Sequence, residues 1–261
     1  MFEMSQALMR PVSSTLNDCA LEHIDRTAID VERARDQQQA YRRLLEELGV
    51  VIHMLPEIDD HPDACFVEDP VVQVGAEWVV LQMGSSARRG EEQTIKCWLS
   101  SQGFRTVEMG GQATAEGGDV LSIGRTAYIG ISSRTNLRGF EFLRAVGQRN
   151  GIDTWPIQVR KALHLKTACT ALNPHCLIGD MDLLGEGSHL LHERFEIIRP
   201  APEENSACNV VVVGHTVLVP ASCPHTADAL RARGLNVLCV DISEFEKAEA
   251  GLTCLARLFK A

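Results

Sequence analysis

Three residues far apart in the chain have side chains that could form a catalytic set. Cys254 lies near the C-terminal end, His164 lies in the middle of the chain, and Glu116 precedes a Gly-Gly pair. A thiolate is a strong nucleophile, an imidazole can activate it and carry protons, and a carboxylate can orient the imidazole. These residue types predict covalent catalysis by cysteine, provided that the fold brings them together.

Further acidic residues stand close to the ends of predicted strands. Asp63, Glu68 and Asp69 precede one strand, and Asp119 follows Gly117-Gly118 before another. A cluster of carboxylates favours a cationic substrate, because an uncompensated buried cation is unstable. The residues alone also fit a solvated strand entry and an ordinary turn. His164, between two leucines, also fits a buried core histidine.

Two other motifs predict no special chemistry. His189, His192 and Glu193 lack a third well-spaced metal ligand and the HExxH pattern, so we interpret them as a helix surface. The segment 84–90 lacks the GxxxxGK[ST] pattern of a phosphate-binding loop. The sequence therefore predicts no metal site and no nucleotide site.

The composition excludes several classes of protein. The 261 residues include 25 Lys+Arg and 35 Asp+Glu, giving a net charge of −10, which argues against nucleic-acid or anionic membrane surfaces as partners. The first residues do not resemble a secretory signal, and no apolar run is long enough to span a bilayer. Nine widely spaced cysteines without a CxxC motif indicate reduced thiols and predict a cytoplasmic protein.

A repeated unit organises the chain around these residues. Apolar hairpins turn at Gly75, Gly124, Asn173-Pro174 and Gly214, about 40 to 50 residues apart. The first, second and fourth hairpins are each followed by a helix and a third strand. Helices are expected near 31–48, 91–101, 136–148 and 224–233, and further strands near 50–56, 104–109, 155–157 and 237–240.

This repeat predicts a radial fold in one catalytic domain, residues 1–261. With the N-terminal helix and strand as a fifth unit, we expect a five-bladed α/β propeller of pseudo-fivefold repeated ββαβ-type units. A doubly wound sheet is the alternative, but tight hairpins require antiparallel pairs that such a sheet mostly lacks. Loops nearest the axis of a propeller bring distant residues together and form a natural ligand site.

The order of the motifs resembles that of the dimethylarginine dimethylaminohydrolase family, within the guanidine-modifying (amidinotransferase) superfamily. The family fold is a five-bladed α/β propeller, in agreement with the repeat. The resemblance is carried by segments 62–69, 86–91, 116–120, 128–136, 163–167 and 251–254.

The resemblance implies a reaction and a role for each matching residue. Cys254 would attack the guanidinium carbon of an N-omega-methylated arginine and expel dimethylamine or methylamine, and water would then release citrulline. His164 would protonate the leaving amine and activate the water, and Glu116 would orient His164. No metal or organic cofactor is implied. The implied substrate-binding residues are Glu68 and Asp69 for the guanidinium, Asp63 for the α-amino group, Arg88 and Arg134 for the α-carboxylate, and Leu21 in a lid formed by residues 13–21.

Three positions bear on which substrate is used. Lys166 stands where arginine deiminases and amidinotransferases have a second acidic residue, which favours methylated arginine. Glu249, expected beside the substrate, replaces a usual Asp, and Ala250 replaces a common Gly. The alternatives left open are a deiminase or hydrolase of another guanidino or ureido compound and a catalytically inactive small-molecule-binding propeller. A homodimer is also left open.

Overall fold

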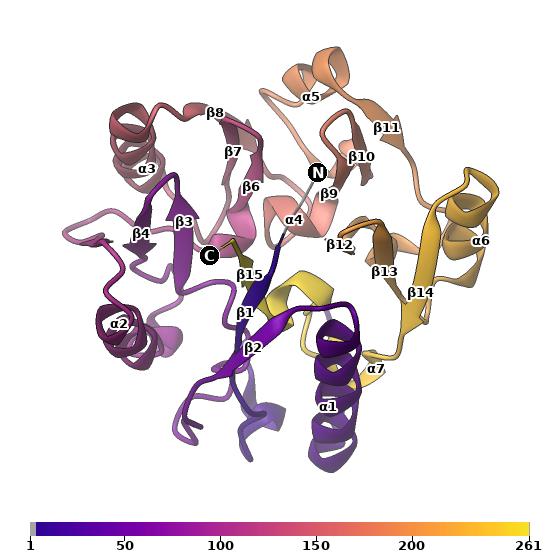
Figure 1. Cartoon of the computed structure of the whole chain (residues 1–261), viewed down its shortest axis with the longest axis horizontal. Helices are drawn as coiled ribbons and strands as arrows, with labels where there is room; N and C mark the ends of the chain where they lie inside the picture. The colour runs from indigo at the N-terminus through magenta and orange to yellow at the C-terminus, as the bar shows by residue number, and fades with distance from the viewer. Residues whose placement is uncertain (1–3, 261) are drawn as a thin grey trace.

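Five three-stranded sheets surround a central axis in the computed structural model, which describes residues 4–260 (Figure 1). In each sheet the central strand pairs antiparallel with one neighbour and parallel with the other. This arrangement confirms the predicted five-bladed α/β propeller. The first four sheets comprise β3 (Val71–Val74), β4 (Glu77–Val80) and β5 (Thr106–Glu108); β6 (Val120–Ile123), β7 (Thr126–Ile131) and β8 (Asp153–Gln158); β9 (Cys169–Asn173), β10 (Cys176–Gly179) and β11 (Glu196–Ile198); and β12 (Val211–Val213), β13 (Thr216–Pro220) and β14 (Asn236–Val240).

The fifth sheet is built from both ends of the described chain. Strand β1 (Gln6–Met9) lies between β15 (Arg257–Phe259) and β2 (Val51–Met54). From the sequence we expected only the helix and the last strand of this blade. The four-residue β1 and the three-residue β15 are too short to show a period of their own, so their pairing defines them.

One helix joins the second and third strands of each blade and lies on the outside of the ring (Figure 1). Asp30 and Asn136 cap two of these helices by accepting backbone N–H groups, as short polar side chains do at helix starts. The five helices are α1 (Val31–Glu47), α2 (Glu92–Ser101), α3 (Leu137–Asn150), α5 (His189–Arg194) and α6 (Pro224–Ala232).

The third repeat is the one that the sequence described least well. Its hairpin turns at Pro174-His175, next to the predicted position. A helix surface was expected at His189 and His192, but the bounds of α5 and the strand β11 were not predicted. His189 and His192 lie on α5 and are exposed, as expected of a helix surface. The helix has only six residues, too few for a clear apolar period.

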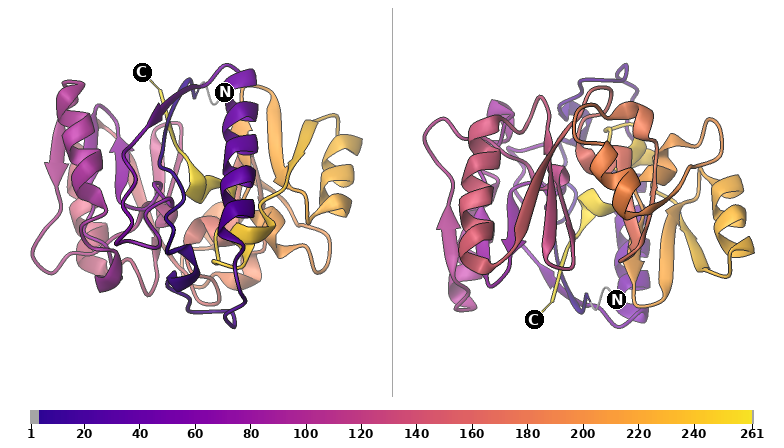
Figure 2. Two further views of the ribbon diagram at one scale, coloured as in Figure 1. Left: turned by 90° about the horizontal axis from the view of Figure 1, so that it is seen from below. Right: turned by 90° about the horizontal axis from the view of Figure 1, so that it is seen from above.

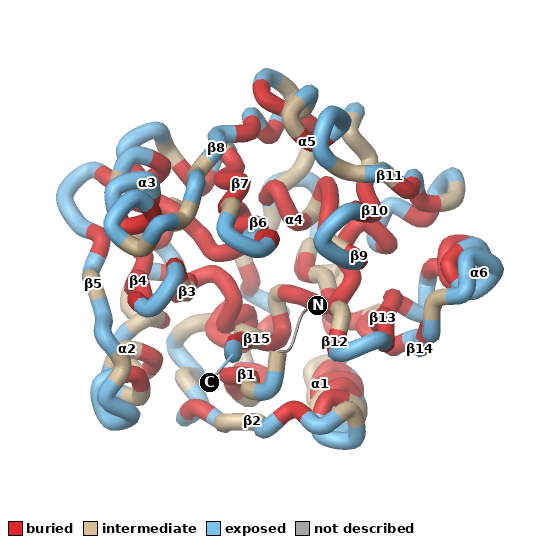
Figure 3. The backbone as a smooth tube through the Cα atoms, turned by 45° about the horizontal axis from the view of Figure 1, so that its top comes forward, coloured by how far each residue is buried: buried red, intermediate tan, exposed pale blue. Residues whose placement is uncertain are grey.

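Hydrophobic clusters fill the space between neighbouring blades and beneath the outer helices. Strands and the loops near the axis are mostly buried, whereas exposed segments lie toward the periphery (Figure 3). Between β1 and α1, the segment 10–30 includes a loop that projects beyond the sheets at one end of the molecule (Figure 2). In residues 4–260, no helix has both the length and the apolar character required to cross a bilayer.

Candidate active site

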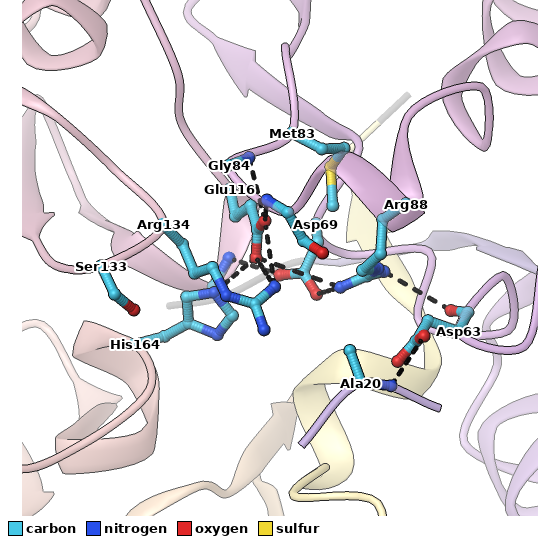
Figure 4. A network of polar contacts seen from close by, with 12 residues as sticks. Ala20, Asp63, Asp69, Met83, Gly84, Arg88, Glu116, Ser133, Arg134 and His164 are labelled. Carbon is cyan, nitrogen blue, oxygen red and sulfur yellow. Dashed lines mark hydrogen bonds and ion pairs between the residues drawn. The ribbon is translucent and has the colours of Figure 1, made fainter. Parts of the chain in front are cut away.

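His164 and Glu116 form a buried pair beside the axis (Figure 4). His164 Nε2 and Glu116 Oε2 are 2.8 Å apart, and the residues are 4% and 0% exposed. Glu116 immediately precedes a short 3₁₀ turn at Gly117–Asp119, and His164 immediately precedes the short helix α4 (Leu165–Ala168). The fold therefore brings together two of the three residues of the predicted catalytic set across 48 positions of sequence.

Asp119 and Gly118 fix the position of this imidazole. Asp119 accepts the Leu165 N–H (2.9 Å) at the start of α4. A Cβ atom at Gly118 would lie 2.6 Å from His164 Nδ1 and 3.0 Å from Asp69 Oδ1. Only glycine permits the backbone to approach the ring so closely. The Gly-Gly pair is therefore part of the site and not merely a turn.

Two buried arginines flank the carboxylates of the site (Figure 4). Arg88 donates to Asp69 Oδ2 (2.8 Å). It also forms a two-point pair with Glu91 (3.1 and 2.9 Å). Arg134 Nη1 lies 3.3 Å from both oxygens of Glu116. The guanidinium of Arg88, which was predicted to bind the α-carboxylate of the substrate, is therefore already paired with carboxylates of the protein.

The acidic pair Glu68 and Asp69 lies in the same region and is buried. Asp69 Oδ1 accepts the Gly118 N–H (2.9 Å). Glu68 accepts from the Lys166 ammonium on one oxygen and from Thr253 Oγ1 (2.6 Å) on the other. Lys166 therefore neutralises one of the two carboxylates predicted to hold a guanidinium.

Cys254 lies in a 3₁₀ turn, Leu252–Leu255, that follows Gly251. Its Sγ accepts the Gly251 N–H (3.4 Å), and its carbonyl oxygen accepts the Glu68 N–H (3.4 Å). Among the hydrogen bonds of residues 4–260, none joins Cys254 to His164. Asn209 anchors the turn by accepting the Thr253 N–H (2.9 Å). The turn that carries Cys254, the predicted nucleophile, is thus attached to the acidic pair through Glu68, and we call it the nucleophile turn.

Burial and charge set the protonation states of the candidate catalytic groups. Burial lowers the pKa of His164, but Asp69, its bond to Glu116, and Asp119 raise it on balance to about 9. Burial acts to raise the pKa of Glu116, yet the bond to His164 and the nearby cationic charges lower it overall. At neutral pH the pair is an imidazolium facing a carboxylate.

The Cys254 thiol is protonated under the same conditions. Burial is the largest cause, and the charges of Glu68 and Asp69 add to it, raising the pKa to about 12. The Gly251 N–H and Lys166 act in the opposite direction. A cation bound against the acidic pair would remove part of this electrostatic penalty and favour the thiolate.

The remaining predicted residues lie in or contact the segment 10–30, which includes the predicted lid of residues 13–21 and is called the lid from here on. Asp63 Oδ2 accepts the Ala20 N–H (3.1 Å), and Leu21 packs against a hydrophobic cluster that Cys254 also contacts. Glu249 accepts backbone N–H groups of residues 22–24. The structure therefore places Glu249 on the lid backbone, beside the site.

Asp69, Glu116 and His164 also have the donor atoms of a cation site. One ligand atom from each lies within 4.8 Å of the others. However, Arg88 and Arg134 already pair with these carboxylates, and the imidazole is itself cationic at neutral pH. The charges of this cluster therefore suit a proton-carrying pair better than a divalent ion.

Sequence reasoning missed three residues that shape the site: Glu91, Asn209 and Glu22. The i, i+3 spacing of Arg88 and Glu91 was the one local signal among them. Asn209 lies in another blade, and Glu22 lies in a loop without periodicity. Their partners become neighbours only in the folded chain.

The fold and this set of residues define an α/β propeller with a cysteine, a histidine and carboxylates gathered at its axis. The family model described as "N,N dimethylarginine dimethylhydrolase, eukaryotic" matches residues 12–178. The N(G),N(G)-dimethylarginine dimethylaminohydrolase of Streptomyces coelicolor is 36% identical over 251 residues, covering 96% of this chain and 95% of that protein. That of Pseudomonas aeruginosa is 31% identical over 253 residues, covering 95% and 96%.

A solved structure of the Pseudomonas aeruginosa protein has the same fold. It is a cysteine-to-serine variant complexed with citrulline, and it superposes with a TM-score of 0.91 at 29% identity, covering 99% of this chain and 100% of that one. The chain belongs to the dimethylarginine dimethylaminohydrolase family.

Proposed function

We propose that this protein hydrolyses N-omega-methylated arginines to citrulline and dimethylamine or methylamine. The observation that carries the proposal is the buried His164–Glu116 pair, whose facing atoms are 2.8 Å apart. The chain belongs to the family described above, and its Cys254 lies beside the acidic residue Glu68. The methylated guanidinium is a cation of the kind that these carboxylates would bind.

The first chemical step uses the substrate's charge to activate the thiol. As the guanidinium binds against Glu68 and Asp69, it lowers the pKa of Cys254, and the thiol proton passes to solvent because His164 is already protonated. Sγ then bonds to the guanidinium carbon, the bond from that carbon to the methylated nitrogen breaks, and the leaving amine takes a proton from His164. A covalent S-alkylthiouronium intermediate remains on Cys254.

The second step returns the enzyme to its starting state. Neutral His164 removes a proton from water, whose oxygen attacks the same carbon. The tetrahedral adduct collapses: its hydroxyl group loses a proton to solvent as the carbon–oxygen double bond forms, and the carbon–sulfur bond breaks. Cys254 leaves as a thiolate, regains a proton from solvent, and citrulline departs. Glu116 holds the imidazole in place and stabilises its cationic form before the first step and after the second.

A substrate panel tests the proposal. Citrulline and dimethylamine should form from asymmetric dimethylarginine, and citrulline and methylamine from monomethylarginine, much faster than ammonia forms from arginine or agmatine. Ammonia release from arginine at a comparable rate would instead identify a deiminase. Normal folding with no turnover and no covalent adduct at Cys254 would favour a binding protein.

The state of the cysteines supports a cytoplasmic location as part of the same proposal. All nine are free thiols, seven of them buried or half-buried among the described residues. Cell fractionation tests this location, and size-exclusion chromatography with light scattering distinguishes a monomer from a homodimer.

A further inference from the structure

Glu249 holds the tip of the lid through main-chain hydrogen bonds. Its carboxylate accepts the N–H groups of Glu22 (2.9 Å), His23 and Ile24 (2.7 Å). Three successive N–H groups that converge on one carboxylate form a concave anion site of the kind called a nest. Glu249 itself adopts φ +57°, an uncommon conformation for a residue with a side chain. The lid tip is therefore fixed to the segment that precedes the nucleophile turn.

The side chain of the same lid residue, Glu22, reaches into the site. Its Oε1 accepts from Arg134 Nε (2.7 Å) and its Oε2 accepts from Ser133 Oγ (2.8 Å). The Glu22 side chain is 36% exposed, whereas that of Arg134 is 4% exposed. An anion thus approaches a buried guanidinium from the solvent side, as the α-carboxylate of an amino-acid substrate would.

Two of the three nitrogen atoms of the Arg134 guanidinium already bind carboxylates, and only Nη2 has no partner among residues 4–260. Its Nη1 lies against both oxygens of Glu116, and its Nε is used by Glu22. Arg88 is saturated by Glu91 and Asp69. A substrate carboxylate can therefore reach Arg134 Nε and Ser133 only by replacing the carboxylate of Glu22.

We propose that Glu22 is a specificity-determining residue whose carboxylate occupies the substrate's α-carboxylate position on Arg134, and that Glu249 positions the lid for this exchange. The inference rests on the proposed function and names the part of the substrate that opens the site. Exchanging one carboxylate for another leaves the charge around Arg134 unchanged. A guanidine without a carboxylate has no group that can take the place of Glu22 on Arg134. It therefore gains no ion pair there and binds less tightly than an amino-acid substrate.

Glu22→Gln tests the exchange, with Asp25→Asn as the matched control. Asp25 lies in the same lid, is exposed, and has no hydrogen-bond or ion-pair partner among residues 4–260. For asymmetric dimethylarginine, E22Q should lower KM about three- to tenfold, the scale of losing one partly exposed ion pair. The KM of its carboxylate-free analogue, N,N-dimethylagmatine, which has no group to exchange for Glu22, should change less, so the preference for dimethylarginine should widen. D25N should change neither quantity.

The outcomes separate this inference from the proposed function. A wild-type protein that does not hydrolyse dimethylarginine refutes the function and, with it, the exchange. An active wild-type protein whose KM and substrate preference are the same in E22Q refutes the exchange alone. A similar change in D25N also overturns it, because the effect would then come from the net charge of the lid.

Amide hydrogen exchange tests the positioning role of Glu249 without turnover. In Glu249→Gln, exchange at residues 22–24 should accelerate by at least about tenfold, because a neutral amide oxygen is a weaker acceptor than a carboxylate. Glu249→Asp should restore part of the protection from exchange. D25N should not accelerate exchange at residues 22–24. Unchanged exchange in E249Q would show that the nest does not hold the lid.

Discussion

At the scale of residues, the protonation states of the protein without substrate favour a substrate whose binding activates the Cys254 thiol. The Cys254 thiol is neutral at neutral pH because burial, Glu68 and Asp69 raise its pKa to about 12. His164 is already an imidazolium, so it is poised to donate a proton and not to remove one from the thiol. A cation bound between the acidic pair and the thiol removes the obstacle to ionisation.

Cys254 should therefore react selectively with a cationic electrophile. We expect 2-chloroacetamidine to alkylate Cys254 at pH 7 about 10- to 1000-fold faster than the neutral 2-chloroacetamide, after correction for their rates with a free thiol. This range corresponds to a pKa lowering of one to three units by an adjacent opposite charge. Inactivation kinetics and peptide mass spectrometry measure the effect.

Substitution of two cysteines separates this reaction from general thiol chemistry. C254S should lose both the adduct and turnover, since an alcohol is a far poorer nucleophile. Cys239→Ser, at an exposed thiol, should retain both. Equal rates with the two reagents would contradict activation by the bound cation.

The raised pKa of His164 predicts the alkaline limb of the reaction. Because the leaving amine needs the imidazolium proton, kcat should fall as pH rises through about 9. Glu116→Gln removes a charge and an acceptor, so the limb should move to lower pH, whereas His192→Gln, on exposed α5, should leave it in place.

H164G should lower kcat by about 10²- to 10⁴-fold, and K166A by much less.

The same shift has a consequence for stability, and its sign follows from linkage. The folded chain binds the His164 proton more tightly than the unfolded chain does. The resulting stabilisation is complete below the ordinary pKa of 6.5 and is lost as pH rises through about 9. Denaturation of wild type and H164G across this window measures it, and an identical pH dependence would contradict the raised pKa.

At the scale of elements, the residues of the site are positioned by close contacts of backbone segments more than by helices. The turn at Gly117–Asp119 carries Glu116 on one side and touches the His164 ring with Gly118. A small change in this turn alters the distance between imidazole and carboxylate, and catalysis is sensitive to such distances.

Gly118→Ala should lower activity while the protein remains folded. The added Cβ would meet His164 Nδ1 at 2.6 Å and force the ring to shift, so we expect kcat/KM to fall about 100-fold. Gly110→Ala is the matched control, because a Cβ there meets no atom within 4 Å. Circular dichroism checks folding, and activity in G118A equal to that in G110A would refute the role of this approach.

The sequence predicted the long elements and missed several of the short ones. Apolar periods and glycine stops gave α1, α2, α3 and α6 to within a few residues, because a helix buries a regular stripe. Strands β1, β11 and β15 have three or four residues each and exist through their partners. A strand of three or four residues spans at most two periods of the strand pattern, which is too few for periodicity alone to define it.

Prediction of the site divides in a similar way. The positions of Cys254, His164 and Glu116 follow from local motifs that resemble those of the family. The contacts of Glu22 and Glu249 are 112 and up to 227 positions apart in sequence, and no local pattern encodes them. These contacts depend on how the lid lies over the closed ring.

At the scale of the whole molecule, the ring depends on joining the first and last strands. Phe259, on β15, lies in a cluster shared with the neighbouring blade, where its ring contacts Trp78 (5.0 Å between centroids), Trp98 (6.0 Å) and Phe104 (6.2 Å). Tilted and edge-to-face aromatic pairs add to the stabilisation that comes from burying their area. The C-terminal strand therefore closes its own sheet and also binds two blades together.

Phe259→Ala should consequently destabilise the entire propeller. A fully buried phenylalanine replaced by alanine costs about 3–5 kcal/mol of unfolding free energy, and Phe259 is 1% exposed. Leu137→Ala, at a side chain that is 65% exposed on α3, should cost less than about 0.5 kcal/mol. Urea denaturation followed by tryptophan fluorescence, with activity recorded in parallel, distinguishes the two.

If F259A shifted the fluorescence change while activity was lost at the wild-type urea concentration, the closing blade would unfold separately from the site. Coincident loss at lower urea is expected, because Cys254 enters the site from the turn that leads directly into β15.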